Sequence, residues 1–151
     1  MSRMYLEDLE VGMRFGGQRF AVDREEMVAF AQQWDPRPIH LVDEAGAAAG
    51  FGGLIASGAY TSAILTRLTA EARKQAGDHA VIAALGSKQR LPHAVRPGDI
   101  LEYSAEITGK RNSRSRSDAG VLETRSTLTN QDRVVVFEAE SVVLVERRGP
   151  G

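Results

Sequence analysis

Residues 58–74 read GAYTSAILTRLTAEARK, and this segment limits the folds that the chain can adopt. Its pattern predicts a helix from about Gly58 to Lys74. The helix is unusually apolar for one that lies on a protein surface, because it contains Ala59, Tyr60, Ala63, Ile64, Leu65 and Leu68. Such a helix needs other elements to cover most of its sides, and a sheet that wraps around it provides that cover.

Four strands are predicted downstream of this helix. They span residues 80–91, 100–110, 120–129 and 134–146. Turn-forming residues separate them, namely Arg96-Pro97-Gly98-Asp99, the polar stretch Asn112–Asp118, and Asn130-Gln131-Asp132. The last strand contains two continuous apolar runs, Val134–Phe137 and Val142–Val145, which indicate that both of its faces are covered.

One strand and one helix are predicted upstream. Residues Arg14–Val22 are compatible with a strand, in which Gly16-Gly17 is typical of a bulge. Asp23 is the expected N-cap of the helix that follows, and Glu26, three residues later, completes a capping-box pattern.

The apolar face of this upstream helix ends at Trp34, because Pro36 and Pro38 stop the helix. Residues 35–58 form an irregular segment with a short helix around Glu44–Ala49. The predicted order is therefore one strand, a helical middle and four strands. An α+β hotdog fold satisfies this order, with an antiparallel five-stranded sheet around a long central helix and a single domain over residues 1–151.

Composition excludes several classes of function. Nineteen basic and twenty acidic residues give a net charge of −1, which argues against a nucleic-acid partner bound through broad phosphate neutralisation. The chain has no cysteine, and its three histidines lack the spacing of a zinc site, so we expect neither a metal nor a cofactor. It also lacks a secretion signal and an apolar run of roughly 18 residues, which predicts a cytoplasmic protein without a membrane partner.

The segment Asp35-Pro36-Arg37-Pro38-Ile39-His40 carries the most chemistry. A carboxylate and an imidazole lie five residues apart on a stretch that two prolines restrict, so both can converge on one water molecule. Histidine gives and takes protons near neutral pH, and a carboxylate beside it can orient it or act as a base. The alternative is structural, with Asp35 capping a turn and His40 bonded within the fold.

Ser57 and Gly58 mark the start of the apolar helix. A helix N-terminus presents unpaired amide groups and a partial positive charge. A glycine there allows a carbonyl to approach those donors, which would stabilise negative charge on a thioester oxygen. The structural alternatives are that Ser57 is the N-cap of the helix and Gly58 a tight bend.

Together these features resemble the MaoC-like (R)-specific enoyl-CoA hydratases of the hotdog superfamily. The Asp35…His40 pair, the 18-residue gap to Gly58 and the helix that follows are similar to the hydratase signature of this family. Leu6–Gly12 resembles the usual opening of the family and Val95–Asp99 its usual turn after the second strand, so the resemblance covers nearly the whole chain.

The resemblance implies a homodimer or higher homo-oligomer that acts on acyl-CoA. It implies that Asp35 and His40 bind the water that adds to the α,β-double bond. The Gly58 amide, preceded by Ser57, would polarise the thioester carbonyl. Thr66 occupies the position of a serine that is linked to the site in the family, although its hydroxyl is equally able to bond its own helix.

The chain departs from the family pattern in two places. Pro36 and Arg37 stand where hydratases commonly have an aromatic residue and an asparagine, and Ser57 stands where a histidine is frequent. Arg37 adds positive charge near the site, which suggests either an acyl substrate that carries a carboxylate or a side chain that points to solvent. A hotdog acyl-CoA thioesterase and a non-catalytic acyl-CoA-binding subunit remain alternatives to the hydratase.

Overall fold

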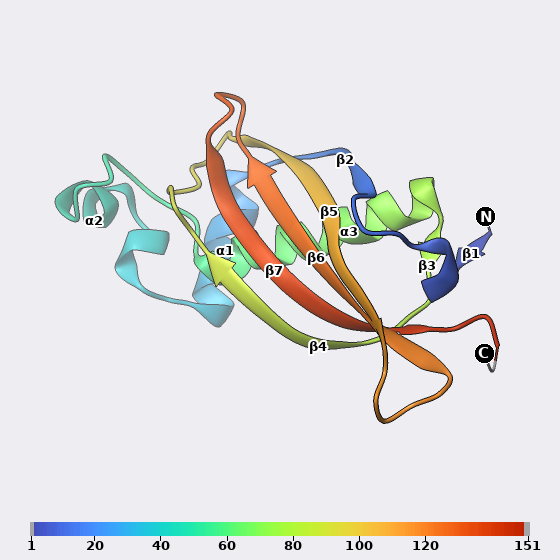
Figure 1. Cartoon of the computed structure of the whole chain (residues 1–151). Coiled ribbons are helices and arrows are strands. Elements are labelled where there is room, and N and C mark those ends of the chain that lie inside the picture. The colour runs from blue at the N-terminus through green and yellow to red at the C-terminus, as the bar shows by residue number, and fades with distance from the viewer. Residues whose placement is uncertain (1, 150–151) are drawn as a thin grey trace.

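An antiparallel five-stranded sheet curves around the long helix α3 (Gly58–Ala76) in the computed structural model, which describes residues 2–149 (Figure 1). The strand order is β2-β5-β6-β7-β4, and every neighbouring pair is antiparallel. The strands are β2 (Arg14–Ala21), β4 (Val81–Arg90), β5 (Ile100–Asn112), β6 (Ala119–Thr129) and β7 (Val135–Glu146). The predicted α+β hotdog architecture is confirmed.

The remaining elements lie around the ends of α3. They are helices α1 (Arg24–Trp34) and α2 (Asp43–Ala48), the single 3-10 turns η1 (Leu6–Asp8) and η2 (Pro38–His40), and strands β1 (Arg3–Met4) and β3 (Asp78–His79). Strands β1 and β3 form a parallel pair that joins the N-terminal segment to the end of α3. The sequence did not predict this pair, because two residues are too few to show any periodicity.

Local sequence signals explain where β2 and α1 begin and bend. The pairing of β2 with β5 shifts register between Gly16 and Arg19, which confirms the predicted bulge. Asp23 caps α1 by accepting a hydrogen bond from the Glu26 amide at 3.0 Å. The Glu26 carboxylate, however, accepts a hydrogen bond from the Tyr60 hydroxyl at 2.7 Å, which ties α1 to the first turn of α3.

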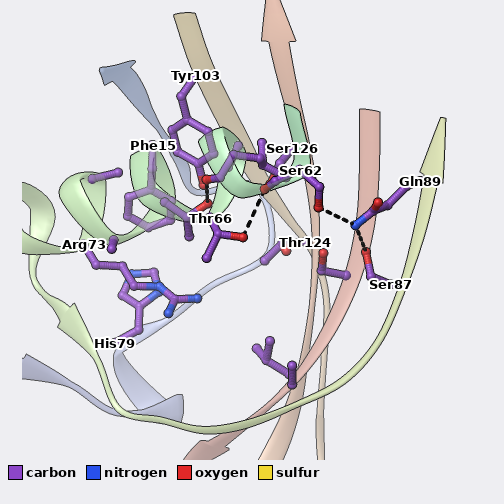
Figure 2. Close-up of a pocket in the computed structure, with 18 of the residues that line it drawn as sticks. Phe15, Ser62, Thr66, Arg73, His79, Ser87, Gln89, Tyr103, Thr124 and Ser126 are labelled. Atoms are coloured by element: carbon purple, nitrogen blue, oxygen red, sulfur yellow. Dashed lines mark hydrogen bonds between the residues drawn. The ribbon is translucent and has the colours of Figure 1, made fainter. Parts of the chain in front are cut away.

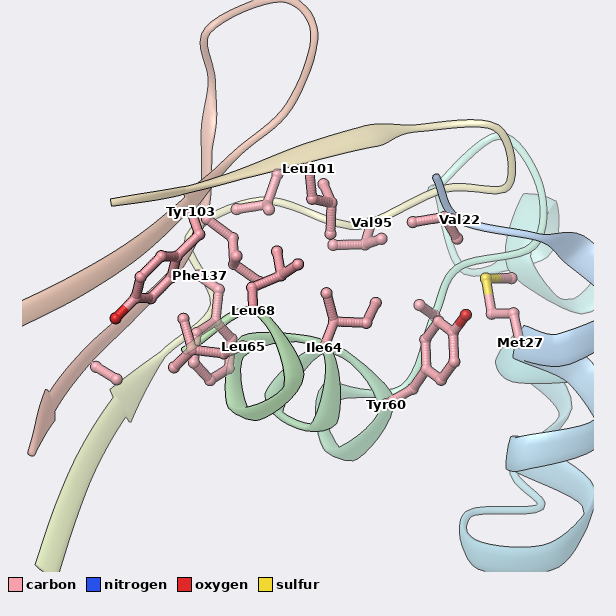
Figure 3. Close-up of a cluster of buried hydrophobic side chains, with 14 of the residues drawn as sticks. Val22, Met27, Tyr60, Ile64, Leu65, Leu68, Val95, Leu101, Tyr103 and Phe137 are labelled. Atoms are coloured by element: carbon pink, nitrogen blue, oxygen red, sulfur yellow. The ribbon is translucent and has the colours of Figure 1, made fainter. Parts of the chain in front are cut away.

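Two sides of α3 face different surroundings. One side, which includes Ser62, Thr66 and Arg73, borders a cavity of about 560 Å³ between the helix and the sheet (Figure 2). The other side packs into the main core, where Ile64 and Leu68 are buried (Figure 3). The apolar residues Ile64 and Leu68 therefore pack in the core on the second side, while the first side borders the cavity.

The main core fills the space between α3, α1 and the concave face of the sheet (Figure 3). Leu68, Leu101 and Phe137 are fully buried within it. Burying a side chain of this size stabilises the fold by about 1.5–3 kcal/mol. The core therefore fixes α3, and with it the start of the helix at Gly58, against the sheet.

Strand β4 is an open edge of the sheet. Its residues are exposed from Ile82 to Arg90, and the Leu85 side chain is 55% accessible. An edge strand with accessible apolar side chains is a surface on which another chain can pair. Among the described residues, no helix is both long and apolar enough to cross a membrane.

Candidate active site

The end of α1 and the turn η2 place Asp35 beside His40. Asp35 is the C-cap of α1, and its amide donates to the Ala31 carbonyl at 2.9 Å. Pro38 then begins η2, which ends at His40. The distance from Asp35 Oδ2 to His40 Nε2 is 3.4 Å. The structure therefore brings together the two side chains that the sequence singled out.

His40 is oriented by a backbone carbonyl. The residue is 3% exposed, and its Nδ1 atom lies 2.9 Å from the Ile55 carbonyl oxygen. A carbonyl oxygen only accepts hydrogen bonds, so Nδ1 carries the hydrogen. In the neutral imidazole Nε2 is then an acceptor that faces the Asp35 carboxylate, and it has no hydrogen-bond partner among the described residues. Two acceptors 3.4 Å apart can both receive hydrogen bonds from one water molecule that lies beside them.

Three hydrogen bonds, each donated by a backbone amide, hold the segment that contains Ile55. The Ile55 amide donates to the Ile39 carbonyl at 3.2 Å, and the Ala56 amide donates to the Val95 carbonyl at 2.8 Å. The Leu54 amide donates to Asp43 Oδ1 at 3.0 Å, a bond that lowers the pKa of Asp43. These bonds hold the Ile55 carbonyl in place and therefore fix the position of His40. The same segment continues directly into the start of α3.

Arg37 binds the proposed catalytic carboxylate. Its Nε and Nη2 atoms donate to Asp35 Oδ1 and Oδ2, each at 2.8 Å, in a bidentate ion pair. The Arg37 side chain is 66% exposed, but its charge is directed to Asp35. The sequence suggested that Arg37 either contacts the substrate or points to solvent. The structure shows a different arrangement, in which Arg37 pairs with Asp35. The Arg37 hydrogen bonds hold the pKa of Asp35 below its ordinary value.

We expect Arg37→Gln to move the acidic limb of the activity profile to higher pH. With Arg37 present, the lowered pKa keeps Asp35 ionised down to more acidic pH. Without the guanidinium that pKa rises, so the active carboxylate is lost earlier as the pH falls. The check is kcat/KM measured against pH for both proteins, with Arg67→Gln as the control variant. An unchanged acidic limb would show that Asp35 ionisation does not govern activity.

Ser57 and Gly58 form the start of α3. The Ser57 hydroxyl is buried and accepts a hydrogen bond from the Tyr60 amide at 3.1 Å, so Ser57 is the N-cap. Gly58 is the first residue of the helix, and its amide has no acceptor within the helix for that reason. Only two residues separate Gly58 from Ile55, whose carbonyl binds His40. The site therefore combines the acid–imidazole pair with a helix N-terminus.

Thr66 lies two turns further along α3, away from Asp35 and His40. Its hydroxyl donates to the Ser62 carbonyl at 3.1 Å, and its side chain lines the cavity beside the helix (Figure 2). The cavity lining does not include Asp35, His40 or Gly58. It begins one turn after Gly58, where Ser62 Oγ accepts a hydrogen bond from Gln89 Nε2 at 3.2 Å. Thr66 thus belongs to the cavity and not to the acid–imidazole pair.

Sequence reasoning missed the groups that position the pair. The Ile55 carbonyl gave no signal, because a backbone acceptor is independent of residue type. The Arg37–Asp35 ion pair could have been predicted, because opposite charges two residues apart can reach each other. The predictions from the sequence did not include this pairing. No cluster of three or more histidine, aspartate or glutamate side chains capable of binding a metal occurs among the described residues.

Comparisons with known proteins agree with this architecture. Residues 9–130 match the family model described as the MaoC-like domain. A MaoC-like dehydratase from Rhodospirillum rubrum superimposes with a TM-score of 0.88 and 36% identity, over 97% of this chain and 99% of that one.

Two sequence relatives cover almost the whole chain. The 3-hydroxybutyryl-CoA dehydratase of Methylorubrum extorquens is 30% identical over 96% of this chain and 86% of its own length. The uncharacterised protein YdeM of Bacillus subtilis is 30% identical over 95% of this chain and 100% of its own length. One of these two relatives is named for a reaction on an acyl-CoA.

Proposed function

Since this chain belongs to the family of MaoC-like dehydratase domains, we propose that it catalyses the reversible hydration of an α,β-enoyl-CoA to a 3-hydroxyacyl-CoA. The observation that carries this proposal is the 3.4 Å approach of Asp35 Oδ2 to His40 Nε2. The free first amide of α3 at Gly58 supplies the second element of the chemistry, an electrophilic contact for a thioester oxygen.

In the proposed reaction Asp35 and His40 both accept hydrogen bonds from one water molecule that lies beside the pair. His40 Nε2 accepts a proton from this water while the water oxygen forms a bond to the β-carbon. The ion pair with Arg37 keeps Asp35 ionised, so the carboxylate orients the water and stabilises the imidazolium. His40 therefore carries the proton in this scheme.

Addition to the β-carbon moves electrons toward the thioester oxygen. The Gly58 amide and the positive end of the α3 dipole stabilise the negative charge that develops there. The His40 imidazolium then gives the proton that it took from the water to the α-carbon, which completes the product and restores the neutral imidazole. One water is consumed for each double bond, and the reverse sequence eliminates it.

Measuring hydration of crotonyl-CoA by the loss of its conjugated absorbance tests the proposal. A hydratase removes this band without releasing a free thiol. A thioesterase releases the thiol, and a binding subunit does neither. Absorbance loss matched by release of an equal amount of free thiol, or no reaction at all, would contradict the proposed activity.

We also propose that the chain works as a homodimer or higher homo-oligomer. Strand β4 is an open edge, and the cavity beside α3 is bordered by exposed β4 residues such as Leu85 and Gln89. Pairing along this edge would satisfy the free backbone groups and cover the cavity.

Light scattering is therefore expected to give at least twice the 16.4 kDa mass of one chain. Ser87→Pro, which removes a backbone donor in the middle of β4, should shift the population toward the monomer. A wild-type protein that remains a monomer at assay concentration would contradict the proposed assembly.

A further inference from the structure

We propose that the cavity beside α3 holds the distal part of an acyl chain that ends in a carboxylate, and that Arg73 and His79 bind this carboxylate. The inference rests on the proposed function, because it treats the cavity as the continuation of the thioester site. It adds a substrate class, the CoA thioesters of dicarboxylic acids, to that function. Figure 2 shows Arg73 and His79 together at one end of the cavity.

Arg73 supplies a positive charge that the described residues do not neutralise. No carboxylate within residues 2–149 lies close enough to form an ion pair with its guanidinium. Arg67 on the same helix is different, because it pairs with Glu71 at 3.3 Å and lies over the Phe20 ring. The Arg73 side chain is half-buried and lines the cavity. A planar guanidinium in this setting suits bidentate binding of a carboxylate.

His79 adds a polar atom that lacks a partner. Its Nε2 atom is buried and has no hydrogen bond among the described residues. The ring is held by an edge contact with Phe15, with centroids 4.9 Å apart. Burial and the nearby charge of Arg73 lower the pKa of His79 to about 4, although the exposed Asp78 acts in the opposite direction. His79 is therefore neutral at neutral pH, and its unsatisfied nitrogen can donate a hydrogen bond to an incoming anion.

One face of α3 leads from the proposed thioester site to this pair. Ser62, Thr66, Thr69 and Arg73 follow Gly58 at helical spacing, and all four line the cavity. The helix rises 1.5 Å per residue, so Gly58 and Arg73 lie roughly 22 Å apart along its axis. A short acyl chain cannot span this distance, whereas a longer one can place its terminus near Arg73.

The cavity wall between the Gly58 end and the Arg73 end of α3 can contact methylene groups, although it contains threonines. Thr66 Oγ1 donates to the Ser62 carbonyl, and Thr69 Oγ1 donates to the Leu65 carbonyl at 2.8 Å. The hydroxyl hydrogens are thus used within the helix, and the threonine methyl groups remain for contact. Leu65, Leu85 and Val143 add apolar surface to the same cavity.

Matched pairs of 2-enoyl-CoA thioesters test the inference. The two members of each pair have the same length and end in a methyl group or a carboxylate, across short, medium and long chains. For longer chains we expect kcat/KM to favour the carboxylate by about 10- to 100-fold, the range for a hydrogen bond to a charged group. For short chains we expect no such preference. Arg73→Gln should abolish the preference, and Arg73→Lys should retain part of it.

Arg67→Gln is the control, because it removes a positive charge from the same helix outside the cavity. It should keep the full preference for the carboxylate. A second readout is the Kd of the corresponding saturated acyl-CoA pairs, which bind without reacting. The same preference is expected in these binding constants.

Two results would overturn the inference. One is equal use of methyl- and carboxylate-terminated chains at every length by the wild-type protein. The other is a preference that survives in Arg73→Gln. In either case, hydration of crotonyl-CoA would leave the proposed function standing. Conversely, tighter binding of saturated carboxylate-terminated chains without any hydration would support the carboxylate site and contradict the proposed function.

Discussion

Replacing His40 with alanine, or Asp35 with asparagine, is expected to lower the turnover of an enoyl-CoA by about 10²- to 10⁴-fold, the usual contribution of a general acid–base group. His40→Ala removes the only proposed proton carrier. Asp35→Asn leaves a neutral amide that cannot stabilise the imidazolium. The measurement is kcat and KM for each variant, with the larger change expected in kcat.

In these variants, loss of turnover caused by unfolding must be separated from loss of turnover caused by the missing catalytic group. His40 is buried and bonded to the Ile55 carbonyl, so His40→Ala also removes a buried hydrogen bond, worth about 1–3 kcal/mol of unfolding free energy. His93→Ala is the matched control, because His93 is exposed and lies outside the proposed site. Denaturant unfolding should show that each variant is folded under assay conditions. A folded His40→Ala or Asp35→Asn protein with normal turnover would refute the assigned roles.

Gly58→Pro should reduce kcat by about 10²- to 10³-fold, the usual effect of losing one oxyanion donor. Proline has no amide hydrogen, so this change deletes the proposed donor to the thioester oxygen. The backbone tolerates it, because Gly58 is the first residue of α3, where proline is favoured. The preceding residue Ser57 has φ −67° and ψ 149°, which a residue before proline adopts readily.

Gly58→Ala provides the control for this change. A Cβ at Gly58 would lie 3.1 Å from Cδ2 of Leu91, and this contact is common to alanine and proline. The Leu91 side chain is 50% exposed and can shift. Gly58→Ala keeps the amide hydrogen, so it should lose far less activity than Gly58→Pro. Equal losses in the two variants would assign the effect to crowding at Leu91 and not to the missing donor.

The sequence was sufficient for the architecture because its signals were local and repeated. The apolar segment at residues 58–74 predicted α3, and strand-compatible stretches with turn residues between them predicted the sheet. The helix stop after Trp34 also followed from sequence, since Pro36 and Pro38 restrict the chain there. These features depend on neighbouring residues and not on tertiary contacts.

The parts that sequence did not predict depend on distant contacts. Glu26 completes a capping-box pattern, yet its carboxylate binds Tyr60, which is 34 residues away. Likewise, the hydrogen bond from His40 to the Ile55 carbonyl arises from how η2 packs against the segment before α3. His79 gave no signal in the sequence, because its burial at Nε2 and its place in the cavity lining depend on the packing of other elements around it. Tertiary packing created each of these interactions.

A crystal structure with a 3-hydroxyacyl-CoA bound tests the central claim most directly. The hydroxyl oxygen of the product marks where the attacking water was held. We expect this oxygen within hydrogen-bond distance of both Asp35 and His40 Nε2, and the thioester oxygen within hydrogen-bond distance of the Gly58 amide. A bound product whose hydroxyl contacts neither side chain, with its thioester remote from Gly58, would contradict the account.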